Sequence, residues 1–159
     1  MLTDLLTAAR VSVRPGTANL DKAGALKLLA SLLAEGIGEG REPVDPDKVE
    51  RVLVEREALQ STGIGDGVAI PHGALAEVDG QIAALLIVPE GLDFDAIDHN
   101  KVNLLFALVG PKRATGEHLK TLARISRLLR NKGFRDRLIS SSDGGEAYAL
   151  LVAEEGGGA

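Results

Sequence analysis

Cysteine is absent from this sequence of 159 residues, and aromatic residues make up only 3% of it. Without cysteine, disulfides, thiolate nucleophiles and cysteine-ligated zinc sites are excluded. With so few aromatic rings, the core must be built from Leu, Ile, Val and Ala, and a surface that stacks on sugars or nucleobases is not expected. Thiol chemistry and ring stacking are therefore removed from the candidate functions.

The charge pattern and the hydropathy of the chain exclude two further classes of protein. The net charge is −5 and no run of five or more basic residues occurs, so binding to nucleic acid through phosphate contacts is not expected. No apolar stretch is long enough to span a bilayer, and the N-terminus lacks the features of a secretory signal. We therefore expect a cytoplasmic protein that neither inserts directly into a membrane nor binds nucleic acid.

The apolar pattern predicts an α/β fold class. Residues 82–88 and 102–109 are continuous apolar runs of strand length, which is typical of central strands covered on both faces. Apolar residues recur at helical spacing in three segments. These predicted helices cover residues 21–35, 46–59 and 117–131. We expect a single layered domain over residues 1–153 and a flexible C-terminal tail at 154–159.

Several shorter elements and helix ends are also predicted. Thr3 is expected to cap a short helix within residues 1–10, and Gly36 to end the first long helix and begin a loop that reaches Gly40. Asp45, followed by proline, marks the start of the second long helix, with Ala58 on its inward face. The remaining predicted elements are a strand at 11–13, a helix at 134–139 and a helix at 143–152 capped by Asp143.

The most informative residue is His72. Three alternate glycines lead into a short apolar strand that Pro71 ends, and His72 follows directly. Histidine can act as a nucleophile, a metal ligand or a proton carrier near neutral pH. The alternative is that His72 is an exposed turn residue without a function. The glycine spacing is similar to a phosphate loop, but a helix precedes it, a strand follows it and Asp66 would repel an anion, so nucleotide binding is not expected.

Two other residues are candidates for the same site. His118 is predicted near the start of a helix, where the positive end of the helix dipole keeps an imidazole neutral. The alternative is a half-buried helix histidine. Arg56 lies near the end of the preceding helix, and its guanidinium could bind an anion close to the glycines, or simply form a surface ion pair.

Metal and cofactor sites are not expected. The three histidines lack the spacing of zinc ligands, and His99 is predicted to be an exposed turn residue. The acidic residues Asp93, Asp95 and Asp98 are typical of a solvated loop. No Gly-x-Ser-x-Gly motif is present for a serine nucleophile, and no cofactor-binding motif was found.

Taken together, these segments resemble the enzyme IIA (EIIA) domain of the fructose/mannitol class, type 2, of the bacterial phosphoenolpyruvate-dependent phosphotransferase system (PTS). Within that class, the free-standing nitrogen-regulatory, PtsN-like branch is most similar. The matching segments are 56–57, 61–65, 69–73, 92–95 with Asp98, 102–108 and 118–119. Two positions depart from the family pattern, since Ala74 replaces a basic or polar residue and Lys101 a proline.

The resemblance implies a mixed sheet of about five strands flanked by helices, and a phosphohistidine relay. His72 falls on the phosphorylated histidine, whose Nε2 the family suggests, and His118 and Arg56 fall on residues that stabilise the phosphate. An HPr-like phosphocarrier would supply the phosphate, ultimately from phosphoenolpyruvate. The glycines around His72 are then expected to give clearance to a docking carrier.

Three outputs of such a relay stay open. The chain could be a regulatory phosphocarrier, a sugar-transport EIIA component that passes phosphate to a separate IIB protein, or a regulatory binding module without onward transfer. Its length leaves no room for a permease or a IIB domain, which favours a regulatory target such as a transporter, kinase or transcription factor. A degenerate domain that has lost transfer is disfavoured, because all three site residues are present.

Overall fold

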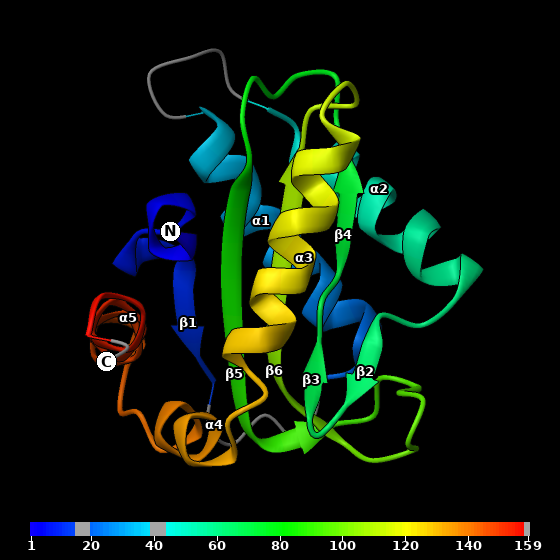
Figure 1. The fold of residues 1–159 in the computed structure, drawn as a ribbon. Helices are drawn as coiled ribbons and strands as arrows, with labels where there is room; N and C mark the ends of the chain where they lie inside the picture. The colour runs from blue at the N-terminus through cyan, green and yellow to red at the C-terminus, as the bar shows by residue number, and fades with distance from the viewer. Residues whose placement is uncertain (15–19, 39–43, 158–159) are drawn as a thin grey trace.

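A mixed sheet of six strands forms the centre of the fold (Figure 1). The computed structural model describes residues 1–14, 20–38 and 44–157. Along the sheet the strands follow the order β1-β5-β6-β3-β2, and β4 pairs with β6 beyond β3. The strands are β1 (Val11–Val13), β2 (Gly63–Gly65), β3 (Val68–Ala69), β4 (His72–Ala74), β5 (Ile82–Leu92) and β6 (Val102–Gly110). The predicted α/β class is confirmed, with six strands where about five were expected.

The two long strands β5 and β6 form the antiparallel centre of this sheet, with Leu85 opposite Phe106. Both strands are buried along most of their length, as their uninterrupted apolar sequences predict. The short strands β3 and β4 both run parallel to β6 and follow each other along it. The break between β3 and β4 falls at Ile70 and Pro71, so His72 is the first residue of a new strand.

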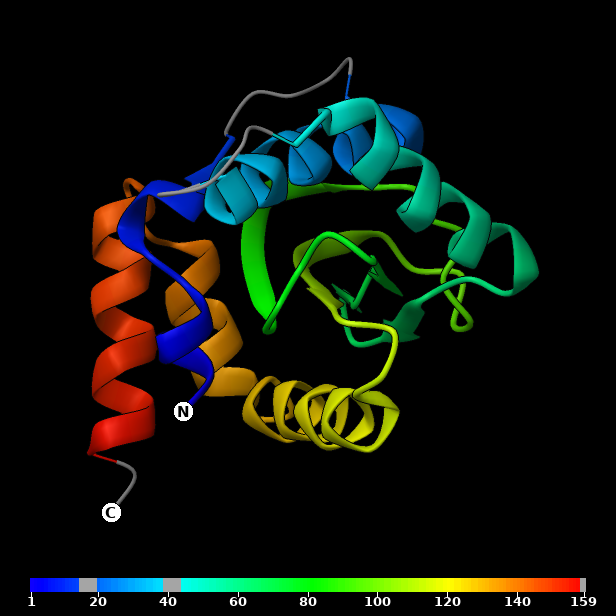
Figure 2. The same cartoon turned by 90° about the horizontal axis from the view of Figure 1, so that it is seen from above.

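Helices cover both faces of the sheet (Figure 2). Helices α1 and α2 lie on one face, and α3 lies on the other, with α4 and α5 beside it near β1. The helices are α1 (Lys22–Gly38), α2 (Pro46–Leu59), α3 (Thr115–Leu128), α4 (Lys132–Ile139) and α5 (Gly144–Gly156). The sheet divides the core, so that Leu29 and Leu53 pack on one face and Ile125 and Phe134 on the other. None of the helices in the described ranges is long and apolar enough to cross a membrane.

The first ten residues differ from the prediction of one helix capped by Thr3. They form two short 3₁₀ turns, η1 (Leu2–Leu5) and η2 (Ala8–Arg10), and Thr3 lies inside the first turn. The main-chain N–H groups of Leu2 and Thr3 donate to the carboxylate of Glu155 at 2.8 and 2.7 Å. A side chain from the far end of the sequence therefore satisfies the first N–H groups of the chain, and Thr3 is a donor there instead of a cap.

Gly36 does not end α1, which continues to Gly38. A Cβ atom at Gly36 would lie 2.9 Å from Cδ and Nε of Arg10. Arg10 is 5% exposed, and its guanidinium donates to the carbonyl oxygens of Ala83 and Leu5. The glycine therefore makes room for a buried arginine. Residues 36–38 of the predicted loop belong to α1, and residues 39 and 40 lie outside the described ranges.

The other long helices start or end close to their predicted positions. Asp45 caps α2 as predicted, since its carboxylate accepts the N–H of Asp47 at 3.0 Å. Ala58 is exposed, contrary to prediction, and the buried residue of that helical turn is Glu57. Helix α5 runs three residues into the segment predicted as a tail, because Glu155 is held by the N-terminal turn.

Candidate functional site

A main-chain carbonyl group determines which ring nitrogen of His72 carries the proton. Strand β4 pairs with β6 so that His72 lies opposite Leu108, and the ring is half-buried. Its Nδ1 lies 2.7 Å from the carbonyl oxygen of Ile70. Since a carbonyl can only accept, Nδ1 must carry the proton. The neutral ring therefore keeps its lone pair on Nε2.

His118 lies beside His72, on the first turn of α3. The two ring centroids are 5.4 Å apart and the ring planes are inclined by 51°. Gly110, at the end of β6, lies beside this ring, and a Cβ atom there would make an ordinary van der Waals contact with Nδ1 of His118, at 3.7 Å. The sequence predicted His118 at the helix start, and α3 in fact begins three residues earlier, at Thr115.

Both imidazoles are held in the neutral form. Burial lowers the pKa of His72, the hydrogen bond to Ile70 raises it in part, the charge of Arg56 lowers it again and that of Glu57 raises it. Burial also lowers the pKa of His118, and repulsion from His72 adds to this effect. The neutral state expected for His118 thus has burial as its cause, where the prediction invoked the helix dipole.

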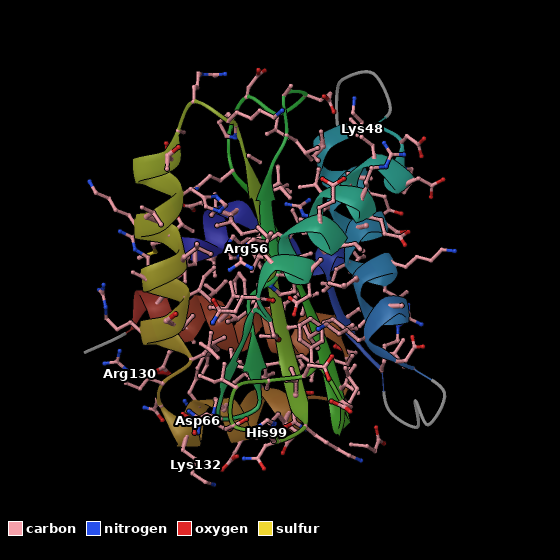
Figure 3. All side chains as sticks on the ribbon, turned by 90° about the vertical axis from the view of Figure 1, so that its right-hand side faces the viewer. Lys48, Arg56, Asp66, His99, Arg130 and Lys132 are labelled. Atoms are coloured by element: carbon pink, nitrogen blue, oxygen red, sulfur yellow. The ribbon has the colours of Figure 1, made fainter. Side chains whose placement is uncertain are left out.

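Arg56 supplies the positive charge of the site. It lies in the last turn of α2, and its Nη1 donates to the carbonyl oxygen of Gln60 at 2.7 Å (Figure 3). This bond holds the guanidinium at the helix end, close enough to His72 for its charge to lower the pKa of the imidazole. The three predicted site residues are thus brought together from α2, β4 and α3.

His99 is not part of this cluster. It lies in the loop between β5 and β6, towards the lower end of the molecule in Figure 3, in a left-handed turn with a φ of 61°. The acidic residues of the same loop bond to protein groups: Asp98 accepts the N–H groups of Asn100 and Asp66, and Asp95 pairs with Lys22 at 3.4 Å. Within the described ranges, no group of three or more His, Asp or Glu side chains is placed to hold a metal ion.

The glycines before His72 serve the fold itself. Gly65 and Gly67 adopt φ angles of 98° and 78°, which are strained for residues with a side chain. A Cβ atom at Gly63 would lie 2.8 Å from Cβ of Ala96, in the β5–β6 loop. The space predicted to admit a docking carrier is therefore filled at Gly63 by the chain's own atoms.

Gly73 is the glycine near His72 at which a side chain would fit least well. A Cβ atom at this position would clash with Cγ1 of Val52, so the valine side chain or the strand would have to shift. Strand β4 thus packs directly against α2. The absence of a side chain at Gly73 sets the distance between the strand that carries His72 and the helix that carries Arg56.

Glu57 is a residue of this region to which the sequence assigned no role. Its side chain is only 5% exposed, and it forms an ion pair with Lys22 at 2.9 Å. Its carboxylate also accepts the N–H of Thr62, at 3.0 and 3.1 Å, and the hydroxyl of Thr62. The helical spacing could have indicated that Glu57 is buried, because it lies four residues after Leu53 and eight after Val49, on the buried face of α2.

These groups are suited to one kind of chemistry. Nε2 of His72 carries a free lone pair at neutral pH, the ring of His118 lies beside it, and the charge of Arg56 acts on the same imidazole. Both neighbours can donate hydrogen bonds to an anionic group that becomes attached to Nε2. This arrangement can accept a phosphoryl group, because phosphoryl transfer depends mainly on positioning and on stabilising the transferred charge.

Comparison with known proteins identifies the family. Residues 8–153 match the family described as phosphoenolpyruvate-dependent sugar phosphotransferase system, EIIA 2. The chain belongs to this family. As an EIIA domain of type 2, it is most similar to the nitrogen-regulatory branch, as the sequence predicted. A nitrogen regulatory protein of Pseudomonas aeruginosa is 38% identical over 157 residues, which cover 98% of this chain and 97% of the relative.

Other relatives of this EIIA domain agree with the assignment. The crystal structure of the nitrogen regulatory protein IIA-Ntr from Neisseria meningitidis has a TM-score of 0.82 and 32% identity, covering 94% of this chain and 98% of that one. A fructose-specific EIIA component of the PTS from Haloferax volcanii is 34% identical over 120 residues, which cover 76% of this chain and 75% of the relative. Nitrogen-regulatory and sugar-specific proteins therefore share this family.

Proposed function

We propose that this EIIA domain accepts a phosphoryl group on Nε2 of His72 from the phosphohistidine of an HPr-like carrier, and that it acts as a regulatory relay of the PTS. The hydrogen bond from Nδ1 of His72 to the Ile70 carbonyl oxygen is the observation that carries the proposal. It leaves Nε2 as the only ring nitrogen with a free lone pair. Burial lowers the pKa of the ring, which keeps that lone pair available at neutral pH.

The transfer step exchanges one phosphorus–nitrogen bond for another. Nε2 of His72 forms a bond to phosphorus while the bond to the carrier histidine breaks, and the electron pair of the broken bond stays on the carrier imidazole. Nδ1 of His72 keeps its proton throughout. The ring gains positive charge as the new bond forms, and the dipole of the Ile70 carbonyl stabilises that charge.

Arg56 and His118 stabilise the phosphoryl oxygens in this proposal. The guanidinium of Arg56 keeps N–H donors beyond the one that holds the Gln60 carbonyl oxygen. The neutral ring of His118 supplies one further N–H without adding a charge that would suppress the nucleophile. The proposed transfer step uses only these side chains and the main chain, and it requires neither a metal ion nor an organic cofactor.

A regulatory output is supported by the nitrogen-regulatory names of two relatives reported above. Phosphorylation adds negative charge at a surface that a partner contacts, so it can switch binding to a transporter, a kinase or a transcription factor. The proposal places the domain in the cytoplasm together with its carrier. Transfer to a separate IIB protein is the second candidate, because the family includes a fructose-specific component.

The test is phosphorylation with the purified chain, phosphoenolpyruvate, enzyme I and the cognate carrier. The wild type should take up one acid-labile, base-stable phosphate, and phosphorus NMR should place it on Nε2. His72→Ala should take up none, while the matched variant His99→Asn should be labelled like the wild type. Equal labelling of His72→Ala, or no labelling of the wild type, would overturn the proposal.

A second measurement separates the two outputs. Labelled protein is mixed with IIB proteins of the same organism, and partner pulldowns compare the wild type with His72→Ala and His72→Glu. Partner sets that change between these variants without loss of label to IIB support the regulatory relay. Rapid loss of label to one IIB protein, with identical partner sets, would support sugar transport.

A further inference from the structure

A continuous series of contacts links a partly buried ion pair to the imidazole of His72. Lys22 pairs with Glu57, and the Glu57 carboxylate accepts the N–H of Thr62. The carbonyl oxygen of Thr62 accepts the N–H of Ile70 at 3.0 Å. The carbonyl oxygen of Ile70 then accepts Nδ1–H of His72 at 2.7 Å. The series joins the start of α1 to residues 57, 62, 70 and 72.

The series is shielded from water along most of its length. Thr62 and Ile70 are each only 4% exposed. The ammonium of Lys22 lies 4.8 Å from the ring centroid of Phe94, which covers one side of the ion pair. Hydrogen bonds in such surroundings are strong and their geometry is well defined, because water does not compete for the partners.

Glu57 is the one residue of the series whose side chain holds another segment in place. The Glu57 carboxylate accepts hydrogen bonds from both the N–H and the hydroxyl of Thr62. The carbonyl oxygen of Thr62 in turn accepts the N–H of Ile70 and so fixes the position of Ile70. A shift of Thr62 would therefore move the carbonyl oxygen that determines which nitrogen of His72 carries the proton.

We propose that Glu57, neutralised by Lys22, is a positioning residue that sets the tautomer and the ring orientation of His72 through Thr62 and Ile70. The inference deepens the proposed function, since it concerns the nucleophile of that reaction. It accounts for a carboxylate that is buried beside the site without lining it. A buried ion pair is by itself poor support for stability, so a role in orientation explains its presence better.

The experiment measures the imidazole of His72 directly, in the unphosphorylated protein. Nitrogen-15 NMR reports which ring nitrogen is protonated and follows the pKa of the ring. The wild type should hold its proton on Nδ1. Glu57→Gln keeps the size of the side chain but removes one acceptor oxygen and the charge. We expect it to populate the Nε2–H tautomer and to lower the pKa of His72, because the charge of Glu57 raises that pKa.

Transfer kinetics provide the second readout. Loss of orientation should slow phosphorylation of Glu57→Gln by about tenfold or more at saturating carrier. The matched control is Glu55→Gln, an exposed residue of the same helix, which should keep the wild-type tautomer, pKa and rate. A rate loss in Glu57→Gln without any change of the tautomer or the pKa would overturn the inference.

A second variant guards against misfolding. Lys22→Gln combined with Glu57→Gln leaves no unpaired buried charge, so it should fold even where a single variant does not. It should show the same change of tautomer, whereas Lys22→Arg should retain the wild-type tautomer. An unchanged tautomer in the folded double variant would overturn the inference. If the wild type is not phosphorylated at all, the proposed function fails, and the tautomer measurement still decides the role of Glu57.

Discussion

The imidazole rings of His72 and His118 lie side by side and tilted, with their centroids 5.4 Å apart, and burial keeps the pKa of each below its ordinary value. Two neutral rings at this distance coexist without repulsion, whereas two imidazolium ions would not. The pair therefore links the protonation of the site to the stability of the whole fold.

This linkage predicts a loss of stability on acidification. The unfolded chain binds protons at these histidines near a pKa of about 6.5, whereas the folded chain binds them only at lower pH. Stability contributed by the pair is therefore full above that value and is lost as the pH falls through the folded pKa values. Urea unfolding between pH 7.5 and 5.5 should show a decreasing free energy of unfolding for the wild type.

The matched variants identify the source of that slope. A double variant, His72→Gln with His118→Gln, should lose much of the pH dependence, while His99→Asn, in the exposed left-handed turn, should retain it. An identical slope in the double variant would show that other groups are responsible.

Removal of Arg56 should affect both the pKa of His72 and the rate of phosphorylation. The charge of Arg56 lowers the pKa of the imidazole, so Arg56→Ala should raise it. Loss of one donor to a developing charge costs roughly 10²–10³ in rate in other enzymes, and a decrease of that order is expected here. NMR titration and single-turnover labelling measure the two effects, with the exposed Arg51→Ala on the same helix as the control.

A methyl group at position 73 should disturb the site by pushing α2 away from β4. The clash with Val52 predicts that Gly73→Ala destabilises the protein by about 1–3 kcal/mol and slows labelling of His72. Val52→Ala should restore much of the loss when combined with Gly73→Ala, because it removes the Cγ1 atom concerned. Strict additivity of the two changes in denaturant unfolding would contradict the contact.

Glu155 should anchor the N-terminal turn. Glu155→Ala removes the acceptor for the N–H groups of Leu2 and Thr3, and a loss of about 1–3 kcal/mol is expected. Hydrogen exchange should become faster at those two amides. The neighbouring Glu154→Ala removes an ion pair with Arg137, whose side chain is 57% exposed, and should leave this exchange unchanged.

Local sequence signals predicted those elements that depend on local chemistry. The apolar runs of β5 and β6, and the capping carboxylate of Asp45 before Pro46, describe their elements directly. The short strand at His72 could not be predicted in this way, because β4 exists only through its pairing with β6. Gly36 was misassigned for a similar reason, since the arginine that fills its space lies 26 residues earlier in the chain.

The site likewise has features that the sequence predicted and features that depend on tertiary contacts. The residue types of Arg56, His72 and His118 and their order carried the resemblance, and the structure brings the three together. The acceptor for His72 is a main-chain oxygen, so no residue type at position 70 could indicate it. The role of Glu57 depends on Lys22, 35 residues away, and its buried position on α2 was the only local signal.

That main-chain acceptor has a genetic consequence. Every amino acid carries a carbonyl oxygen, so no substitution at position 70 can delete the partner of His72. In a saturation mutagenesis screen for loss of the relay, apolar replacements of Ile70 should therefore survive with modest defects of fit. Missense alleles that abolish function should be sought at neighbouring codons instead. The feature on which the nucleophile most depends is thus the one that point mutation is least able to remove.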